Sequence, residues 1–155
     1  MNISLKWLIT TSLVNLIGNS LGAVISLGQN LAADWGGSLN GQDVLQDFLG
    51  FKGTALSAPL SFMLIQLVIT SLALRPGRLG KVGVGGLTFI GLFYTLAQAG
   101  EPIVWQQLGP GGFDMVQFLV LLVNILSAIA MLVFGIQAYR TMRASVVATT
   151  QVVSP

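Results

Sequence analysis

The chain has 155 residues, 54% hydrophobic and only 8% charged, whereas about a quarter of the residues in a soluble domain are charged. So few charges cannot cover a water-soluble surface, and the length predicts a single integral membrane domain. The absence of cysteine and histidine excludes disulfides, haem or iron–sulfur ligation by these residues, most zinc sites and histidine-based acid–base catalysis.

The first predicted element is a transmembrane helix over residues 7–28. This uncharged run of 22 residues follows Lys6 and exceeds the roughly 7–15 residues of a signal-peptide core, so we expect it to be retained. Its polar residues Asn15 and Asn19 share a face. They could bind a ligand or ion, but hydrogen bonds between helices are the commoner use of such side chains.

Two glycines of this helix, Gly18 and Gly22, form a G-x-x-x-G pair that permits close approach of a second helix. The pair could form a homodimer interface. Because the same chain supplies three further helices, we expect the contact to lie within one subunit.

A long outer loop, residues 29–55, follows the first helix. Within it, residues 43–51 are predicted to form a short amphipathic helix at the outer membrane interface, because the apolar side chains recur at helical spacing. The apolar positions are Val44, Leu45, Phe48 and Leu49. We expect these four side chains to face the bundle or lipid.

The second predicted helix covers residues 56–74, with Pro59 in its first turns, where the missing N–H costs little. Residues 75–81 form a tight basic turn that forces an antiparallel hairpin with the third helix, residues 82–100. The third helix is rich in glycine, which indicates tight packing against another helix. Its glycines include Gly83, Gly85, Gly86 and Gly91.

The second outer loop covers residues 101–114, and its last residue, Asp114, is a natural cap for the fourth helix, residues 115–139. Residues 144–155 are uncharged, and we expect a short, mobile cytoplasmic tail. The chain is thus predicted to be all-α: a four-helix membrane bundle over residues 1–143, up-down-up-down, with one interfacial helix in the first outer loop.

Basic and acidic residues are separated across the predicted membrane. All basic residues but Lys52 fall on one side of the four predicted helices, and every acidic residue falls on the other. The first group is Lys6, Arg75, Arg78, Lys81, Arg140 and Arg143. The second is Asp34, Asp43, Asp47, Glu101 and Asp114. By the positive-inside rule, both termini are cytoplasmic, which is typical of a plasma (inner) membrane protein.

Glu101 is the most informative single residue. It follows the carboxyl end of the third helix, where the helix dipole disfavours negative charge, and Lys52 precedes the amino end of the second, where positive charge is disfavoured. A structural ion pair between Lys52 and Glu101 would relieve both. Alternatively, Glu101 belongs to an outer pocket for a ligand or partner, or is solvated beyond the helix end. The pocket residues would be Tyr94, Gln98, Glu101 and Gln106, with Asn15 and Asn19 of the first helix.

No catalytic constellation, cofactor motif or metal-binding spacing is present, so the sequence favours a non-enzymatic role. The leading hypothesis is a subunit or accessory factor that binds another membrane protein, or a second copy of itself, through helix faces and outer loops. The alternative is a small transporter, channel or lipophilic-ligand binder with an outward pocket near Glu101; a membrane enzyme acting on lipid is third. The basic residues suit orientation and anionic headgroups in the bilayer, so no nucleic-acid partner is expected.

Overall fold

The computed structural model describes residues 3–34, 43–109 and 113–152, the stretch 144–152 by its backbone alone. In these ranges the chain is all-α, as the composition predicts. The helices are α1 (Ile3–Gln29), α2 (Val44–Leu49), α3 (Leu60–Ala73), α4 (Gly77–Ala99), α5 (Pro102–Leu108) and α6 (Met115–Val152).

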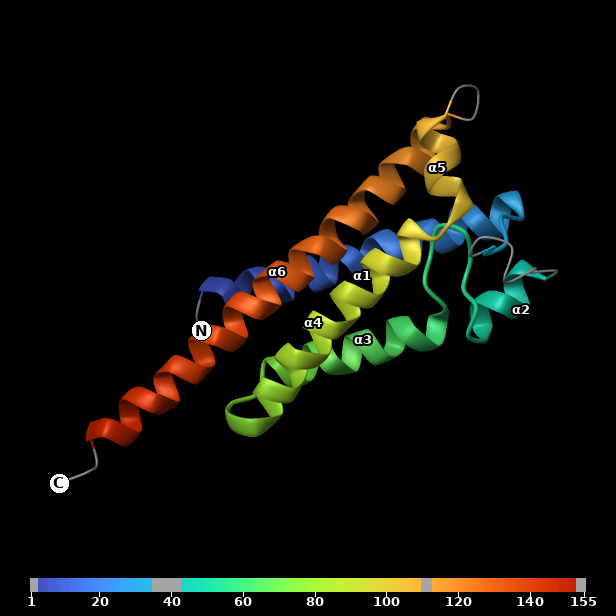
Figure 1. Ribbon diagram of the computed structural model, residues 1–155. Helices are drawn as coiled ribbons and strands as arrows, with labels where there is room; N and C mark the ends of the chain where they lie inside the picture. Colours follow the sequence, from blue (N-terminus) through green and yellow to red (C-terminus); the bar gives the residue numbers. More distant parts are fainter. Residues whose placement is uncertain (1–2, 35–42, 110–112, 153–155) are drawn as a thin grey trace.

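Helices α1, α3, α4 and α6 run up, down, up and down through one bundle (Figure 1). Helix α6 packs along both α1 and α4, and α3 packs mainly on α4. The start of α1 and the α3–α4 turn lie at one end, which carries Lys6, Arg75 and Arg78 and is called the basic end below. Helices α2 and α5 lie at the opposite, acidic end, with Glu101 and Asp114.

Three helices are long and apolar enough to cross a membrane: α1 with 27 residues, α4 with 23, and the first 29 residues of α6. The fourth predicted span is shorter than expected. Helix α3 has 14 residues, or about 21 Å at 1.5 Å per residue, against a hydrocarbon core of about 30 Å. The predicted helix over residues 56–74 is therefore wrong at its start.

Pro59 explains the late start of α3. It adopts extended geometry (φ −62°, ψ 151°) at the N-cap and has no N–H to donate, while the residue before a proline also avoids helical angles. Upstream, Gly53 has a φ of +81°, and the N–H groups of Thr54 and Ser57 donate to each other's carbonyl oxygens at 2.9 and 3.3 Å. Residues 53–59 are thus an extended, turned segment, called the entry segment below.

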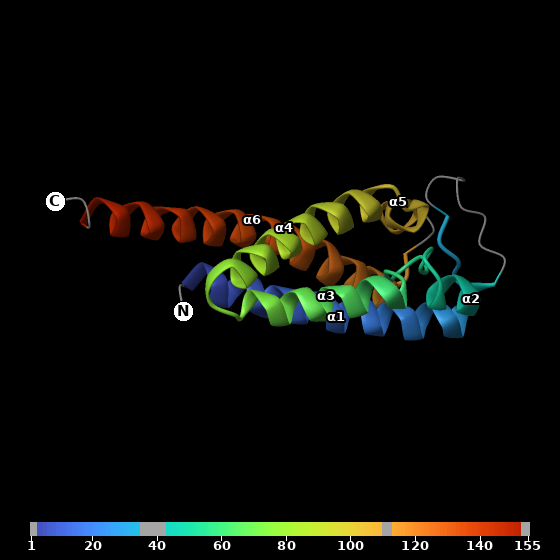
Figure 2. The ribbon, with the colours of Figure 1, turned by 90° about the horizontal axis from the view of Figure 1, so that it is seen from below.

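The other helix bounds also differ from the predictions. Pro76 is extended (φ −72°, ψ 162°), and Gly77 has a positive φ of +73°, which glycine adopts without strain. Helix α4 therefore begins at Gly77 rather than at residue 82, and the turn is shorter than residues 75–81. Helix α6 continues past residue 139 to Val152, because no proline or glycine follows Gly135 until Pro155. The predicted tail is thus helical through 144–152, and 153–155 lie outside the described residues; Figure 2 shows α6 extending past the start of α1.

Glycines let the helices approach closely, as the sequence predicts. A Cβ built on Gly18 would collide with Asn124 of α6, and one built on Gly22 with the carbonyl oxygen of Leu56. The G-x-x-x-G pair therefore makes its close contacts within the subunit, which confirms the expected arrangement. In α4, a Cβ on Gly91 would lie 2.7 Å from the backbone nitrogen of Leu132 in α6.

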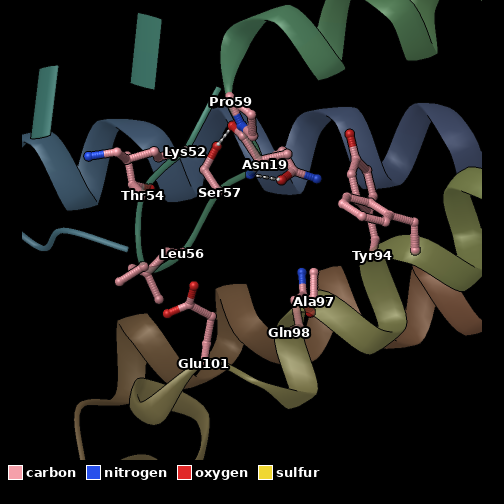
Figure 3. Close-up of a pocket in the computed structure, with 13 residues that line it drawn as sticks. Asn19, Lys52, Thr54, Leu56, Ser57, Pro59, Tyr94, Ala97, Gln98 and Glu101 are labelled. Atoms are coloured by element: carbon pink, nitrogen blue, oxygen red, sulfur yellow. Dashed lines mark hydrogen bonds between the residues drawn. The ribbon is translucent and has the colours of Figure 1, made fainter. Parts of the chain in front are cut away.

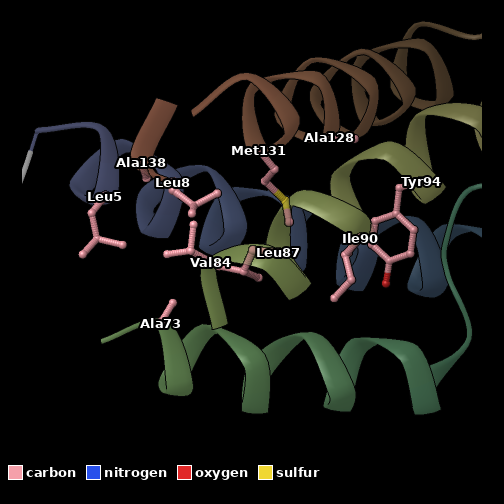
Figure 4. Close-up of a cluster of buried hydrophobic side chains, with 10 residues drawn as sticks. All are labelled: Leu5, Leu8, Ala73, Val84, Leu87, Ile90, Tyr94, Ala128, Met131 and Ala138. Atoms are coloured by element: carbon pink, nitrogen blue, oxygen red, sulfur yellow. The ribbon is translucent and has the colours of Figure 1, made fainter. Parts of the chain in front are cut away.

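An apolar cluster closes the bundle toward its basic end (Figure 4). Leu8 of α1, Val84 and Leu87 of α4, and Ala128 and Met131 of α6 are fully buried within it. Because the three longest helices all contribute, the cluster fixes their mutual packing in this half of the bundle.

A helix is present within the predicted range of residues 43–51, as α2, and the facing of its apolar side chains toward the bundle or lipid stays a prediction. Asp43 caps it, since its carboxylate Oδ1 accepts from the Gln46 N–H at 3.0 Å. Val44 is buried, whereas Leu45 and Leu49 are more than half exposed. The position of α2 at a membrane interface remains a prediction.

Candidate functional site

A cavity of about 50 Å³ lies at the acidic end, between α1, the entry segment and the carboxyl end of α4 (Figure 3). Its volume suits a few water molecules or a very small ligand. The side chains that give it polar character are Asn19, Lys52, Thr54, Ser57, Tyr94, Gln98 and Glu101.

The structure brings together four of the six residues predicted to form a pocket, namely Asn19, Tyr94, Gln98 and Glu101. Tyr94 and Gln98 are four residues apart on α4 and share one helix face, and the turn at Gly100 adds Glu101 to the same cavity. Asn15 lies one turn further along α1 and is fully buried outside the cavity lining. Gln106 is exposed on α5 and does not line the cavity.

Glu101 is only 5% exposed, so the alternative of a solvated residue beyond the helix end is wrong. The chain turns at Gly100, and Glu101 then takes the N-cap position of α5, ahead of Pro102. This turn directs the carboxylate inward, where its Oε2 accepts from the Asp34 N–H at 3.3 Å.

Among the described residues, Lys52 makes its direct ion pair with Asp47 rather than with Glu101, and a contact between Lys52 and Glu101 through water stays a prediction. Both residues line the cavity, but the Lys52 Nζ pairs with Asp47 Oδ1 at 3.3 Å. The reason is local: the Gly53 N–H donates to the Asp47 carbonyl at 3.0 Å, so the chain folds back over α2 and sets Lys52 beside Asp47. The Lys52 side chain is 44% exposed.

Three cavity side chains keep a buried polar atom that has no hydrogen-bond partner among the described residues. These atoms are Thr54 Oγ1, Tyr94 OH and Gln98 Oε1. Thr54 and Tyr94 are each only 4% exposed. Buried polar groups are nearly always satisfied by protein or ordered water, so several unsatisfied groups around one cavity indicate that something polar binds there.

The entry segment forms one wall of the cavity and was missed at the sequence level. Asn19 Oδ1 accepts from the Ala58 N–H at 2.7 Å, and Asn124 Nδ2 donates to the Leu56 carbonyl at 3.0 Å. Non-helical backbone at membrane depth is tolerated only where protein satisfies it or a cavity is lined by it. Pro59 combined with Gly53 is the sequence signal that could have revealed the break.

A chain of buried polar side chains leads from the cavity along α1. Asn19 Nδ2 donates to Asn15 Oδ1 at 3.1 Å, and Gln66 Nε2 donates to the same oxygen at 3.3 Å and to Ser12 Oγ at 3.1 Å. Ser12 in turn lies 2.8 Å from the Thr70 hydroxyl. Asn15 and Asn19 thus serve as the hydrogen-bonding links between helices that the sequence favours.

A second hollow is an apolar groove of about 350 Å³ between α1 and α6. Its walls include Ile17, Gly18 and Leu21 of α1 with Leu119 and Val123 of α6. No polar side chain contributes to it, so its chemistry suits an acyl chain or an apolar helix.

Comparison with protein-family models, curated proteins and solved structures finds no match for the chain. The functional inference therefore depends on the geometry of the cavity.

Proposed function

We propose that the protein is a small polytopic membrane protein that binds a small polar ligand in the cavity at its acidic end. The observation that supports this function is the set of three buried polar atoms, on Thr54, Tyr94 and Gln98, that have no partner among the described residues. By the positive-inside rule the acidic end faces outward, so the ligand would enter from outside the cell.

The closed basic half of the bundle favours binding over an open channel. The polar chain that starts at Asn19 reaches Ser12 and Thr70, and the apolar cluster around Leu8, Val84 and Leu87 fills the bundle beyond it. A conducting pore would need polar or wide passage through that cluster. A transporter would need a conformational change that opens the cluster.

Thermal unfolding of the full-length chain in detergent micelles, followed by tryptophan fluorescence, tests this function. The probes are the chlorides of sodium, potassium and ammonium, and the neutral solutes urea and ethylene glycol. We expect at least one probe to raise the midpoint in a saturable way, because a ligand that binds only the folded state stabilises it.

A pair of alanines on α4 supplies the matched control. Ala97 lines the cavity, whereas Ala99, two residues further along, is exposed. Ala97→Leu should fill the cavity and abolish the shift, and Ala99→Leu should keep it. A shift that survives Ala97→Leu unchanged, or no shift with any probe, would refute binding at this cavity.

The role as a subunit or accessory factor remains a prediction. The exposed apolar faces of α1, α3 and α6 suit lipid as well as a partner helix, so they do not favour a partner protein over the bilayer.

A further inference from the structure

The charges at the cavity point to the class of ligand. Among the described residues that line it, Glu101 carries the one carboxylate and Lys52 the one ammonium. The Lys52 ammonium is paired with Asp47 at 3.3 Å and points away from the Glu101 carboxylate (Figure 3). Glu101 is almost fully buried, and a charge at a poorly hydrated wall acts on an ion more strongly than it would in water.

The neutral groups around the cavity add oxygen atoms. The hydroxyls of Thr54 and Tyr94 and the amide oxygen of Gln98 are buried without a partner in the described part of the chain. Each presents a lone pair, and oxygen is the ligand that hard cations prefer. Sites for divalent ions draw on several carboxylates, whereas the described residues contain no cluster of three acidic, histidine or cysteine side chains. The single carboxylate of the cavity would balance the charge of one monovalent cation.

Two helix ends border the cavity with opposite polarity. The carboxyl end of α4 contributes Ala97 and Gln98, and the amino end of α3 contributes Pro59. Their dipoles amount to about half a charge of opposite sign each, so they largely offset one another. The Glu101 carboxylate therefore sets the sign of the site.

We infer that the cavity binds a small monovalent cation, either an alkali-metal ion or ammonium, through Glu101, Thr54 and Gln98. This inference depends on the proposed function and names the ligand class of the same site. The cavity volume of about 50 Å³ suits such an ion with one or two waters.

The test measures the unfolding midpoint of the full-length chain at constant ionic strength, with N-methylglucamine chloride replaced stepwise by sodium, potassium or ammonium chloride. We expect a saturable rise with at least one of the three, and the comparison among them separates an alkali-metal ion from ammonium. Glu101→Gln should weaken the apparent affinity by about tenfold or more, since a contact to a charged group is lost. Asp114→Asn removes a carboxylate that only caps α6, and should leave the affinity unchanged.

If Glu101→Gln does not fold, Thr54→Val decides, because it replaces only the hydroxyl by a methyl group and should weaken the cation's affinity severalfold. An equal shift in all variants would overturn the inference by placing the cation elsewhere. A shift with urea or ethylene glycol but with no cation would also overturn it, while leaving the proposed function standing. No shift with any probe would refute both.

Discussion

The backbones of α3 and α4 approach so closely at Gly83 that a quantitative prediction is possible. Gly83 of α4 is buried, and a Cβ built on it would meet the backbone nitrogen of Ala73 and lie 2.7 Å from the carbonyl carbon of Leu72. Gly85, two residues later on the same helix, is exposed and has open space around its Cβ position. Both glycines lie inside α4, so they differ in the space around the Cβ position and not in the helix propensity gained on substitution.

The expected magnitudes follow from that difference. Both Gly83→Ala and Gly85→Ala gain the same helix propensity, up to about 1 kcal/mol. Only Gly83→Ala forces a methyl group against the helix backbone, where no rotamer change relieves it, and overpacking of this kind costs about 1–3 kcal/mol. We expect Gly85→Ala to be neutral or slightly stabilising and the unfolding free energy of Gly83→Ala to lie about 1–3 kcal/mol below it.

The assay is denaturant-induced unfolding of the full-length chain in detergent micelles. Trp7 of α1 stacks on Phe134 of α6, so its fluorescence reports tertiary structure, and far-ultraviolet circular dichroism reports helix content. An unchanged slope with a lower midpoint for Gly83→Ala would be a true loss of stability. Equal midpoints for the two variants would refute backbone contact between α3 and α4 at Gly83.

Two further predictions concern the orientation and the buried polar chain. Because the chain has no cysteine, single cysteines at Pro76 and Gln106 should react with an impermeant thiol reagent from opposite sides of the membrane; reaction from one side only would contradict the topology. Gln66→Leu should lower the unfolding free energy by about 1–3 kcal/mol, because the Ser12 and Asn15 side chains lose a buried donor. An unfolding curve identical to that of the wild type would show that this amide is dispensable.

The long helices were predictable from the sequence, whereas the positions of their ends were not. A bilayer requires long uncharged helices, so the lack of charge over residues 7–28 and 115–139 sufficed to find α1 and α6. Where each helix begins depends on backbone chemistry at prolines. Pro59 ends an extended segment rather than sitting inside the first turn, and Pro76 with Gly77 forms a tight turn rather than a longer loop.

The site was predictable where its residues share one helix face. Tyr94 and Gln98 follow from the helical period, whereas the position of Glu101 also depends on the turn at Gly100. Thr54 could not be found in this way, because its place depends on the break before α3 and on side chains far away in the sequence. Lys52 pairs directly with Asp47 rather than with Glu101 because a dipole at a helix end contributes only about 0.3–1 kcal/mol, whereas the turn after α2 places Asp47 3.3 Å from the Lys52 ammonium.

The proposed ligand binding and the folding of the chain would depend on different side chains of the same cavity. Asn19 accepts from the Ala58 N–H, so its loss would leave a backbone group of the entry segment unsatisfied and would disturb the cavity wall itself. Its variants would therefore weaken binding even if the ligand never touched it. Tyr94 OH and Gln98 Oε1 make no hydrogen bond to a backbone group among the described residues. Their removal should therefore change the unfolding free energy little. Weaker binding at unchanged stability in Tyr94→Phe would thus mark a group kept for a ligand.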